Sequence, residues 1–246
     1  MRLYLGARDF KPEGFSTVDI DPAVRPDIVA DIVNLSPIAD ESCNEVVAGH
    51  VLEHVEWPDG FLALSEFARV LRRGGAIKIA VPDLGLLART LLSGDSAFHV
   101  TGLIFGVAGR TNPFEKHRYG YTAGMLVDIL ETLGFGDFRW WNSEIPDASN
   151  GWCHGPDGQR VAISLNISAV KKGSPAVPPR ELYDALKDNP LGDFVSIAAR
   201  LRGSSDAAEA DAESAVPKLY QYVHFQLIEA RQRIRYLEEQ LARANR

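Results

Sequence analysis

The stretch from Leu3 to Asp21, LYLGARDFKPEGFSTVDID, decides the fold of this chain. The apolar run Leu3–Leu5 ends in a glycine turn at Gly6, and a polar loop leads to a second run, Ser16–Ile20, with Asp19 near its far end. This order outlines a nucleotide site, because bare backbone at Gly6 lets a ligand approach closely and Asp19 can hold the two hydroxyls of a ribose. The glycine pattern is incomplete, so the interpretation depends on the rest of the chain.

Composition narrows the class of protein. The chain has 246 residues, 46% hydrophobic content and a net charge of -7. No apolar run approaches twenty residues, so we expect a soluble globular domain with an appendage. The first residues enter a strand without a signal-peptide pattern, which favours the cytoplasm. Negative charge argues against a nucleic-acid partner, and Cys43 and Cys153 are too few for a disulfide framework or a zinc cluster.

Apolar runs alternate with helical patterns over the first two thirds of the chain, which predicts an α/β sheet covered by helices. The expected strands after Ile20 cover residues 28–30, 45–48, 76–81, 138–141 and 161–170. The expected helices cover 60–71 with Asp59 as N-cap, 84–92, and 122–133 with Thr122 as N-cap. The long loop 93–121, rich in glycine, aromatic and basic residues, is expected to be functional.

The first two crossovers are unusually short. Residues 6–15 and 21–27 are all that separate the first three strands, whereas a parallel crossover normally needs a dozen or more residues. The helices that cover one face of the sheet are therefore expected to be missing. The exposed apolar face needs another cover, and we expect Arg180–Leu201 or a second subunit to supply it.

Several segments carry a family resemblance. LYLGARDF, FSTVDIDP, PDIVADIVNL, EVVAGHVLEHV, ALSEFARVLRRGGAIKIAVPDL and EKHRYGYTAGMLVDILETLGF, in this order, resemble the small class I S-adenosylmethionine-dependent methyltransferases. The resemblance covers residues 1–142, and its most specific parts are HVLEH and the RVLRRGG-strand-PDL block. It implies a Rossmann-like sheet with S-adenosylmethionine as cofactor. Bacterial members of this type often accompany genes for surface polysaccharide and glycosyl transfer, which implies a small-molecule or saccharide acceptor methylated on oxygen.

The resemblance also implies roles for single residues. Leu5, Gly6 and Ala7 match positions that hold the methionine part of the cofactor, and Asp19 matches the ribose-binding carboxylate. The adenine positions are Asp31 and Ile32, and the positions beside the methyl group are His50, Val51 and Leu52.

Arg8 departs from the family pattern, which usually has a further glycine there. A positive φ is disfavoured for arginine, and the long side chain lies at the cofactor position. Arg8 could pair with the cofactor carboxylate through its fork of donors, or it could fill the pocket. The second outcome would make the protein a catalytically silent scaffold that recruits partners through its C-terminal helix. This is the alternative to the enzyme.

Three histidines are candidate bases for methyl transfer to oxygen, because the histidine pKa lies near neutral pH. They are His50, His54 and His117. Each also has a structural interpretation: His50 can shape the cofactor site, His54 can bond within a helix, and the KHRYGY segment can dock the following helix. Trp140, Trp141 and Trp152 could line an acceptor groove, but tryptophans near strands are more often core.

His50, Glu53 and His54 also match H-x-x-E-H, in which two histidines bind zinc and the glutamate activates water. This interpretation is the weaker one, because the segment leaves a strand directly and no downstream helix offers a clear third ligand. We therefore expect no metal.

After the methyltransferase-like domain, residues 1–172, the composition changes. Residues 173–216 form a linker with a helical segment that is interrupted at Asn189–Pro190. Residues 217–246 carry apolar side chains at a/d spacing: Tyr220, Val223, Leu227, Ala230, Ile234, Leu237 and Leu241. This predicts a coiled-coil helix that makes a homo-oligomer or binds a partner helix, with contact to an anionic membrane surface as the weaker alternative.

Overall fold

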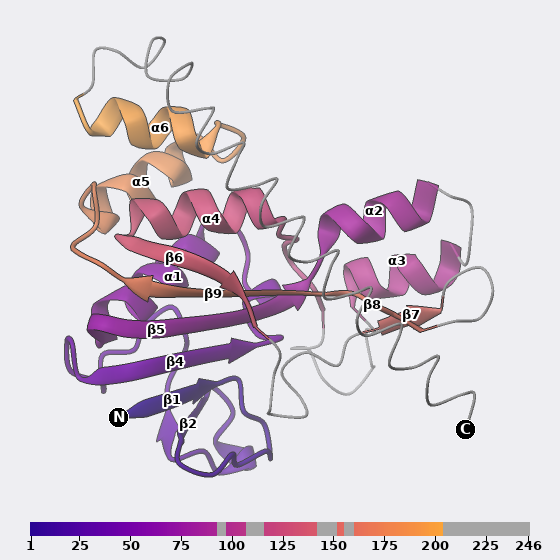
Figure 1. Ribbon diagram of the computed structural model, residues 1–246, viewed down its shortest axis with the longest axis horizontal. Helices are drawn as coiled ribbons and strands as arrows, with labels where there is room; N and C mark the ends of the chain where they lie inside the picture. Colours follow the sequence, from indigo (N-terminus) through magenta and orange to yellow (C-terminus); the bar gives the residue numbers. More distant parts are fainter. Residues whose placement is uncertain (93–96, 107–115, 142–151, 155–159, 204–246) are drawn as a thin grey trace.

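The computed structural model describes residues 1–92, 97–106, 116–141, 152–154 and 160–203. Within these residues, seven strands form one sheet in the order β3-β2-β1-β4-β5-β9-β6 (Figure 1). In that order their bounds are Ile28–Val29, Ser16–Asp19, Arg2–Leu5, Cys43–Gly49, Leu71–Pro82, Ser164–Lys171 and Phe135–Trp140. Strands β1 to β5 pair in parallel, and β9 runs antiparallel to both β5 and β6. This is the sheet of the Rossmann-like class I methyltransferase fold, as the sequence predicted.

Strand β1 lies between β2 and β4, so the chain order reverses beside it. In open α/β sheets, ligands bind at the carboxyl ends of the strands at such a reversal. The turn after β1, the end of β2 and the segment after β4 therefore lie where a ligand site is expected.

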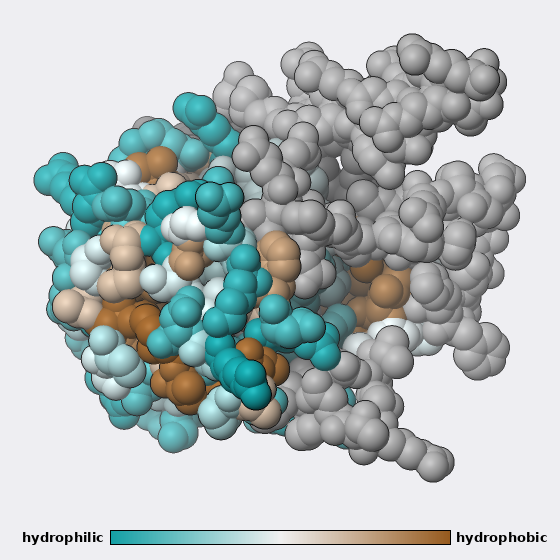
Figure 2. Space-filling model, turned by 90° about the horizontal axis from the view of Figure 1, so that it is seen from below, coloured by the Kyte–Doolittle hydropathy of each residue, from teal (hydrophilic) through white to brown (hydrophobic). Residues whose placement is uncertain are grey.

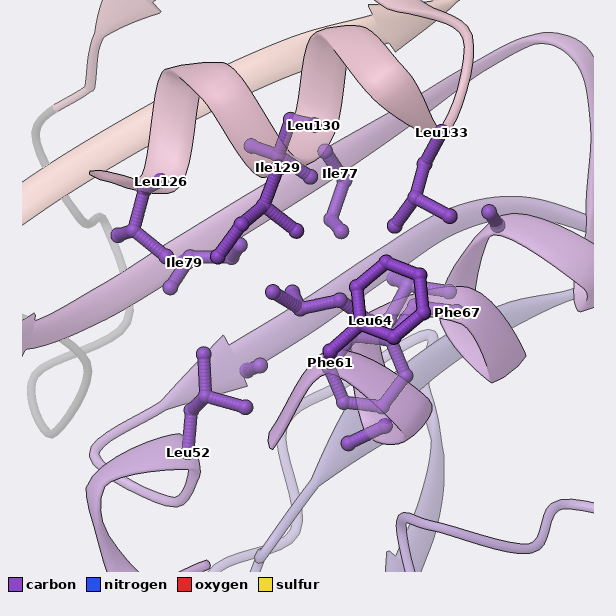
Figure 3. Close-up of a cluster of buried hydrophobic side chains, with 14 of the residues drawn as sticks. Leu52, Phe61, Leu64, Phe67, Ile77, Ile79, Leu126, Ile129, Leu130 and Leu133 are labelled. Atoms are coloured by element: carbon purple, nitrogen blue, oxygen red, sulfur yellow. The ribbon is translucent and has the colours of Figure 1, made fainter. Parts of the chain in front are cut away.

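One face of the sheet carries the main core. Helices α1 (Asp59–Val70) and α4 (Ala123–Thr132) pack there, and α5 (Pro179–Asp188) and α6 (Phe194–Leu201) join them. Figure 3 shows how side chains of α1 and the α4 region meet Ile77 and Ile79 of β5. The amphipathic patterns of these helices explain the packing, since their apolar stripes need a partner surface.

The two helices expected to be missing are absent from the described crossovers. Residues 6–15 contain no helix, and the connection from β2 to β3 contains only the 3-10 turn η1 (Pro22–Val24). On the sheet face that these helices would cover, Tyr4 contacts Phe10 and Phe15, with ring centroids 5.7 and 6.2 Å apart. The loop that replaces the first helix thus supplies aromatic cover of its own.

Charged side chains occupy much of the same face. Glu45 pairs with Arg2 at 2.6 Å and with Lys78 at 2.8 Å. Ion pairs and aromatic rings therefore both lie on this face. Seen from below, at the β2 edge of the sheet, hydrophobic and hydrophilic residues are interspersed (Figure 2).

The expectation that Arg180–Leu201 covers this face is wrong. Leu182 and Leu186 of α5 and Ile197 of α6 belong to the main core, where α5 contacts α1 and α6 contacts α4. Side chains alternate along β1, so Leu3 and Leu5 face this core while Tyr4 faces the other side. The two helices thus lie on the sheet face opposite to the expected one. Cover by a second subunit stays a prediction.

Three elements differ from expectation. Helix α3 (Ala97–Phe105) lies within the expected loop 93–121, near α2 (Leu84–Leu92). The expected strand 161–170 is divided, with β8 (Arg160–Ala162) pairing with β7 (Trp152–His154) and β9 beginning after Ile163. Helix α1 begins at Asp59, but Pro58 is its N-cap and no side chain caps it. Thr122 does cap α4, accepting a bond from the Met125 amide.

Two of the tryptophans are core residues. Trp140 packs against the main core, and Trp141 is 8% exposed and donates its indole N–H to the Ile79 carbonyl at 3.1 Å. Among the described residues, no helix combines the length and apolar character needed to cross a bilayer. The expected coiled-coil helix, 217–246, lies outside the described residues.

Candidate active site

A pocket of about 900 Å³ opens at the carboxyl ends of β1, β2 and β4. It is lined by most of the site residues that the sequence predicted: Gly6, Arg8, Asp19, Asp31, Ile32, His50, Val51, His54 and His117. Leu5, Ala7 and Leu52 do not line it. Their side chains are at most 1% exposed and pack in the hydrophobic clusters, so these three residues build the walls behind the pocket.

Gly6 turns the backbone tightly beside Val51 at the pocket. It has φ +65, and a Cβ at this position would lie 2.6 Å from Cγ2 of Val51. Its amide donates to the Val18 carbonyl at 2.9 Å, which ties the turn after β1 to β2. Only glycine fits both the left-handed backbone and the space beside Val51.

Asp19 presents a fixed carboxylate at the end of β2. The side chain is buried, its Oδ2 accepts from the Arg8 amide at 2.8 Å, and its Oδ1 accepts from the Asp21 amide at 2.9 Å. Each carboxylate oxygen can accept more than one hydrogen bond, so both can still receive a ligand hydroxyl. Asp31 lies just beyond β3, and its Oδ1 accepts a hydrogen bond from the Val33 amide at 3.1 Å.

Arg8 adopts the left-handed conformation, with φ 51. A side chain in this region costs on the order of 1 kcal/mol, which explains why a glycine is usual at this position in the family. Arg8 is exposed and is one of the residues that line the pocket.

His50 also has a positive φ, 52, where the chain leaves β4. Its Nδ1 lies 3.0 Å from Oε1 of Glu53, and its Nε2 lies 2.8 Å from Oγ of Ser164 in β9. An ionised carboxylate only accepts, so Nδ1 carries the proton and, in the neutral ring, Nε2 accepts from the Ser164 hydroxyl. Both ring nitrogens are engaged, and His50 is a positioning residue for Glu53.

Glu53 lies in the 3-10 turn η2 (Leu52–His54) and is 1% exposed. Among the described residues, its Oε2 has no hydrogen-bond partner. Burial acts to raise the pKa of Glu53, but the hydrogen bond and charge of His50, with the charge of His54, outweigh it and hold the pKa below its usual value. The pocket wall thus contains a buried carboxylate, one oxygen of which has no hydrogen-bond donor among the described residues.

His54 and His117 meet beside this carboxylate, with ring centroids 5.1 Å apart. Nδ1 of His54 lies 3.1 Å from the Lys116 carbonyl, and Nδ1 of His117 lies 2.9 Å from the Leu103 carbonyl. Carbonyls only accept, so each Nδ1 carries the proton and each neutral ring keeps a lone pair on Nε2. Burial lowers the pKa of His117, partly offset by the charge of Glu53, which favours the neutral imidazole.

Part of the KHRYGY segment lines the pocket, and part of it packs in the core. The amides of Arg118 and Tyr119 donate to the Glu53 carbonyl at 2.7 and 3.2 Å, which brings His117 to His54. Arg118 lines the pocket and pairs with Glu56. Tyr119 stacks on Trp57 at 5.3 Å, and Tyr121 is fully buried, which raises the pKa of its hydroxyl. His117 and Arg118 line the pocket, whereas Tyr119 and Tyr121 pack in the core.

Sequence reasoning missed part of the lining. The zinc pattern is the only sequence signal that includes Glu53, and it does not indicate that this carboxylate is buried. Leu103 and Ile163 also line the pocket, and they come from α3 and from the break between β8 and β9. Their position depends on tertiary packing, so nothing in the sequence marks them.

The fold and pocket agree with what the chain matches. The family model described as "Methyltransferase domain" matches residues 11–79, from the loop after β1 into β5. No curated protein matches the chain. The sheet order and the matched domain support an S-adenosylmethionine-dependent methyltransferase and imply S-adenosylmethionine as its cofactor.

Solved structures that are similar to this chain include two described as S-adenosylmethionine-dependent methyltransferases. One, from Archaeoglobus fulgidus, is 19% identical, with 69% of this chain and 85% of that chain covered and a TM-score of 0.46. The other, from Thermotoga maritima, is described as a possible histamine N-methyltransferase and is 19% identical, with 69% and 81% covered and a TM-score of 0.45. A Haloferax volcanii putative methyltransferase in complex with the Trm112 activator is 15% identical, with 70% and 81% covered and a TM-score of 0.43.

The residues present fit this cofactor. Gly6 leaves no room for a side chain and so offers bare backbone, and Asp19 offers fixed acceptor oxygens at the end of β2. The cofactor carries a carboxylate, an ammonium and a sulfonium but no phosphate, and the pocket accordingly offers carboxylates and two arginines, Arg8 and Arg118.

Proposed function

We propose that the protein transfers a methyl group from S-adenosylmethionine to an oxygen of a sugar or saccharide. The observation that carries the proposal is a single pocket with two chemically different halves. One half is lined by Gly6, Asp19 and Asp31, and the other by His54, His117 and Arg118. A cofactor in the first half would present its methyl group to an acceptor in the second.

The cofactor half has a residue for each part of the molecule. Backbone at Gly6 would lie against the methionine, and Asp19 would accept from the ribose hydroxyls. Asp31 and the Ile32 amide would hold the adenine, and the Arg8 guanidinium would pair with the cofactor carboxylate. When bound, the cofactor supplies a methyl group made electrophilic by its sulfonium.

The acceptor half can take the proton from an acceptor hydroxyl. A hydroxyl must lose its proton as its oxygen attacks the methyl carbon. His54 and His117 line the pocket, and the Nε2 lone pair of either neutral ring would assist this loss. Arg118 and Glu56 add donors and acceptors suited to further hydroxyls. Leu103 and Ile163 supply apolar surface for a ring face. This mixture of polar and apolar lining supports a saccharide acceptor.

Product analysis tests the proposed reaction. The protein would be incubated with methyl-labelled S-adenosylmethionine and a panel of free and nucleotide-linked sugars. We expect one acceptor to gain a methyl group bonded to oxygen, assigned by mass spectrometry and NMR. Methylation only on nitrogen or carbon acceptors offered in the same assay would contradict the oxygen assignment. Failure to bind the cofactor at all would favour the silent scaffold.

A further inference from the structure

The side chains of Glu53, His54 and His117 converge on the acceptor half of the pocket, with their ligand-capable atoms all within 4.8 Å of one another. We propose that they form a binding site for a divalent transition-metal ion, with Zn²⁺ as the ion of best fit. Resting on the proposed function, we further infer that the acceptor hydroxyl occupies the remaining position on this ion.

Three free lone pairs define the site. The Nδ1 atoms of His54 and His117 are used by backbone carbonyls, which leaves the Nε2 atoms as ligands. The Oε2 atom of Glu53 is buried and has no hydrogen-bond partner among the described residues. A buried acceptor without a donor is unfavourable, and two neighbouring lone pairs do not satisfy it. A cation between the three atoms would satisfy all of them.

Every ligand already has the outer partner that metal sites use to orient their ligands. His50 holds Oε1 of Glu53 at 3.0 Å and is itself held by Ser164 at 2.8 Å. The Lys116 carbonyl orients the His54 ring, and the Leu103 carbonyl orients the His117 ring. These contacts set the tautomer of both imidazoles and engage one carboxylate oxygen, which leaves one ligand atom of each residue for an ion.

The donor set selects the type of ion. Two imidazoles and one carboxylate are the protein ligands of a class of catalytic zinc sites, which keep a fourth position open. Mg²⁺ and Ca²⁺ prefer all-oxygen surroundings. With zinc–ligand distances of about 2.1 Å, tetrahedral ligand atoms lie about 3.4 Å apart, so each pair here closes by at most about 1.4 Å. Rotation of the side chains is sufficient for that movement.

This site is not the one that the H-x-x-E-H pattern suggests. In that pattern, the two histidines of HVLEH bind the metal and the glutamate acts on water. In the structure, His50 holds Glu53, and Glu53 itself is a ligand. The third ligand, His117, comes from the segment whose backbone is bonded to Glu53. The third ligand of the proposed site therefore comes from the long loop and not from a downstream helix.

An ion at this site would aid the methyl transfer by making the acceptor hydroxyl more acidic. The hydroxyl oxygen would form a bond to the methyl carbon while the carbon–sulfur bond breaks. The electron pair of that bond stays on sulfur, which becomes a neutral thioether, and the hydroxyl proton goes to solvent. The ion would replace direct proton acceptance by His54 or His117.

The test is metal binding by the full chain. After removal of metals with a chelator, Zn²⁺ is titrated by calorimetry, and Co²⁺ binding is followed by its visible absorption. We expect one ion per chain, with affinity lowered roughly 100-fold or more in His54→Gln and in His117→Gln. Glu56→Gln and His224→Gln, which change a pocket-lining carboxylate and a histidine elsewhere in the chain, should bind zinc as the original does. No binding, or binding unchanged by both histidine variants, would overturn the site.

The melting temperature gives a second test of zinc binding, which does not depend on calorimetry. Zn²⁺ at saturating concentration should raise the melting temperature of the original chain and not that of His117→Gln, because only the folded site binds the ion. S-adenosylhomocysteine is titrated into the same samples. Cofactor binding without zinc binding would overturn the metal site alone. Zinc binding without cofactor binding would overturn the proposed function and, with it, the role of the ion in methyl transfer.

Discussion

At the scale of single residues, three positive-φ positions lie at the pocket. Gly6, Arg8 and His50 have φ of 65, 51 and 52, and all three line it. Non-glycine residues keep such conformations only where the surrounding structure imposes them, and such residues are common at functional sites. Here the backbone turns sharply after β1 and β4, so that the two strand ends can face one ligand.

Gly6 provides the sharpest test of this packing. Gly6→Ala should lower the free energy of unfolding by about 2 kcal/mol, because the new methyl group meets Val51 and the backbone is left-handed. In the double variant Gly6→Ala/Val51→Ala, the stability lost to the clash with Val51 should be recovered. The stability lost to the left-handed backbone should remain lost. Urea denaturation of the two single variants and the double variant measures both. Unchanged stability of Gly6→Ala would show that the turn is not as close as described.

A glycine substitution at Arg8 distinguishes the effect of backbone strain from the effect of a contact with the cofactor. Arg8→Gly removes the strained side chain, and loss of a charged hydrogen bond of roughly 1.5–3 kcal/mol should weaken S-adenosylhomocysteine binding about tenfold to a hundredfold. Arg25→Gly is the matched control, since Arg25 has φ 53 and does not line the pocket. Calorimetry gives the affinities. Equal affinity in both variants would mean that Arg8 makes no contact with the cofactor.

At the scale of elements, the open sheet face shows what a sequence can reveal. The lengths of residues 6–15 and 21–27 predicted the missing helices, because chain length limits what a crossover can contain. The apolar stripe of α5 predicted burial but not the surface that it meets, since amphipathicity does not identify the partner. The meeting of Glu53 with His117 was likewise beyond sequence reasoning, because it depends on how the long loop folds back.

The Glu45 ion pairs on that face should make stability depend on pH. Burial acts to raise the pKa of Glu45, but hydrogen bonds and charges from Lys78 and Arg2 outweigh it, so the pKa lies below the ordinary 4.5. A lowered carboxyl pKa contributes stability that is present above pH 4.5 and is lost as the pH falls through the folded-state pKa. Glu45→Gln should therefore be destabilised by about 1 kcal/mol at pH 7 and match the original chain at lower pH.

Denaturation curves at pH 7, 5, 4 and 3 measure this difference. Glu13→Gln, at an exposed loop position, is the control and should follow the original chain throughout. A deficit of Glu45→Gln that persists undiminished at pH 3 would show that the residue acts by packing and not by charge.

At the scale of the whole molecule, α5 and α6 are part of the folded domain. Their buried residues Leu182, Leu186 and Ile197 extend the core that β5, α1 and α4 begin. The segment reads as a linker in the sequence, because SPAVPP precedes it and Asn189–Pro190 interrupts it. Proline-rich connections also occur between packed helices.

Truncation distinguishes this core from the predicted coiled coil. A chain ending at Gly203 should keep the melting temperature of the full chain within a few degrees, whereas one ending at Lys172 exposes apolar core and should aggregate or unfold. By sedimentation, we expect the chain ending at Gly203 to be monomeric and the full chain to be larger. A full chain that sediments as a monomer would contradict assembly through 217–246.

The central claim is that the pocket at the strand ends binds S-adenosylmethionine. Calorimetric titration of the full chain with S-adenosylhomocysteine tests it most directly, with Asp19→Asn as the site variant and Asp184→Asn, on the exposed surface of α5, as the control. We expect one site per chain, affinity at least about tenfold weaker in Asp19→Asn, and no change in Asp184→Asn. Absence of binding by folded protein to both this product and the cofactor itself would contradict it.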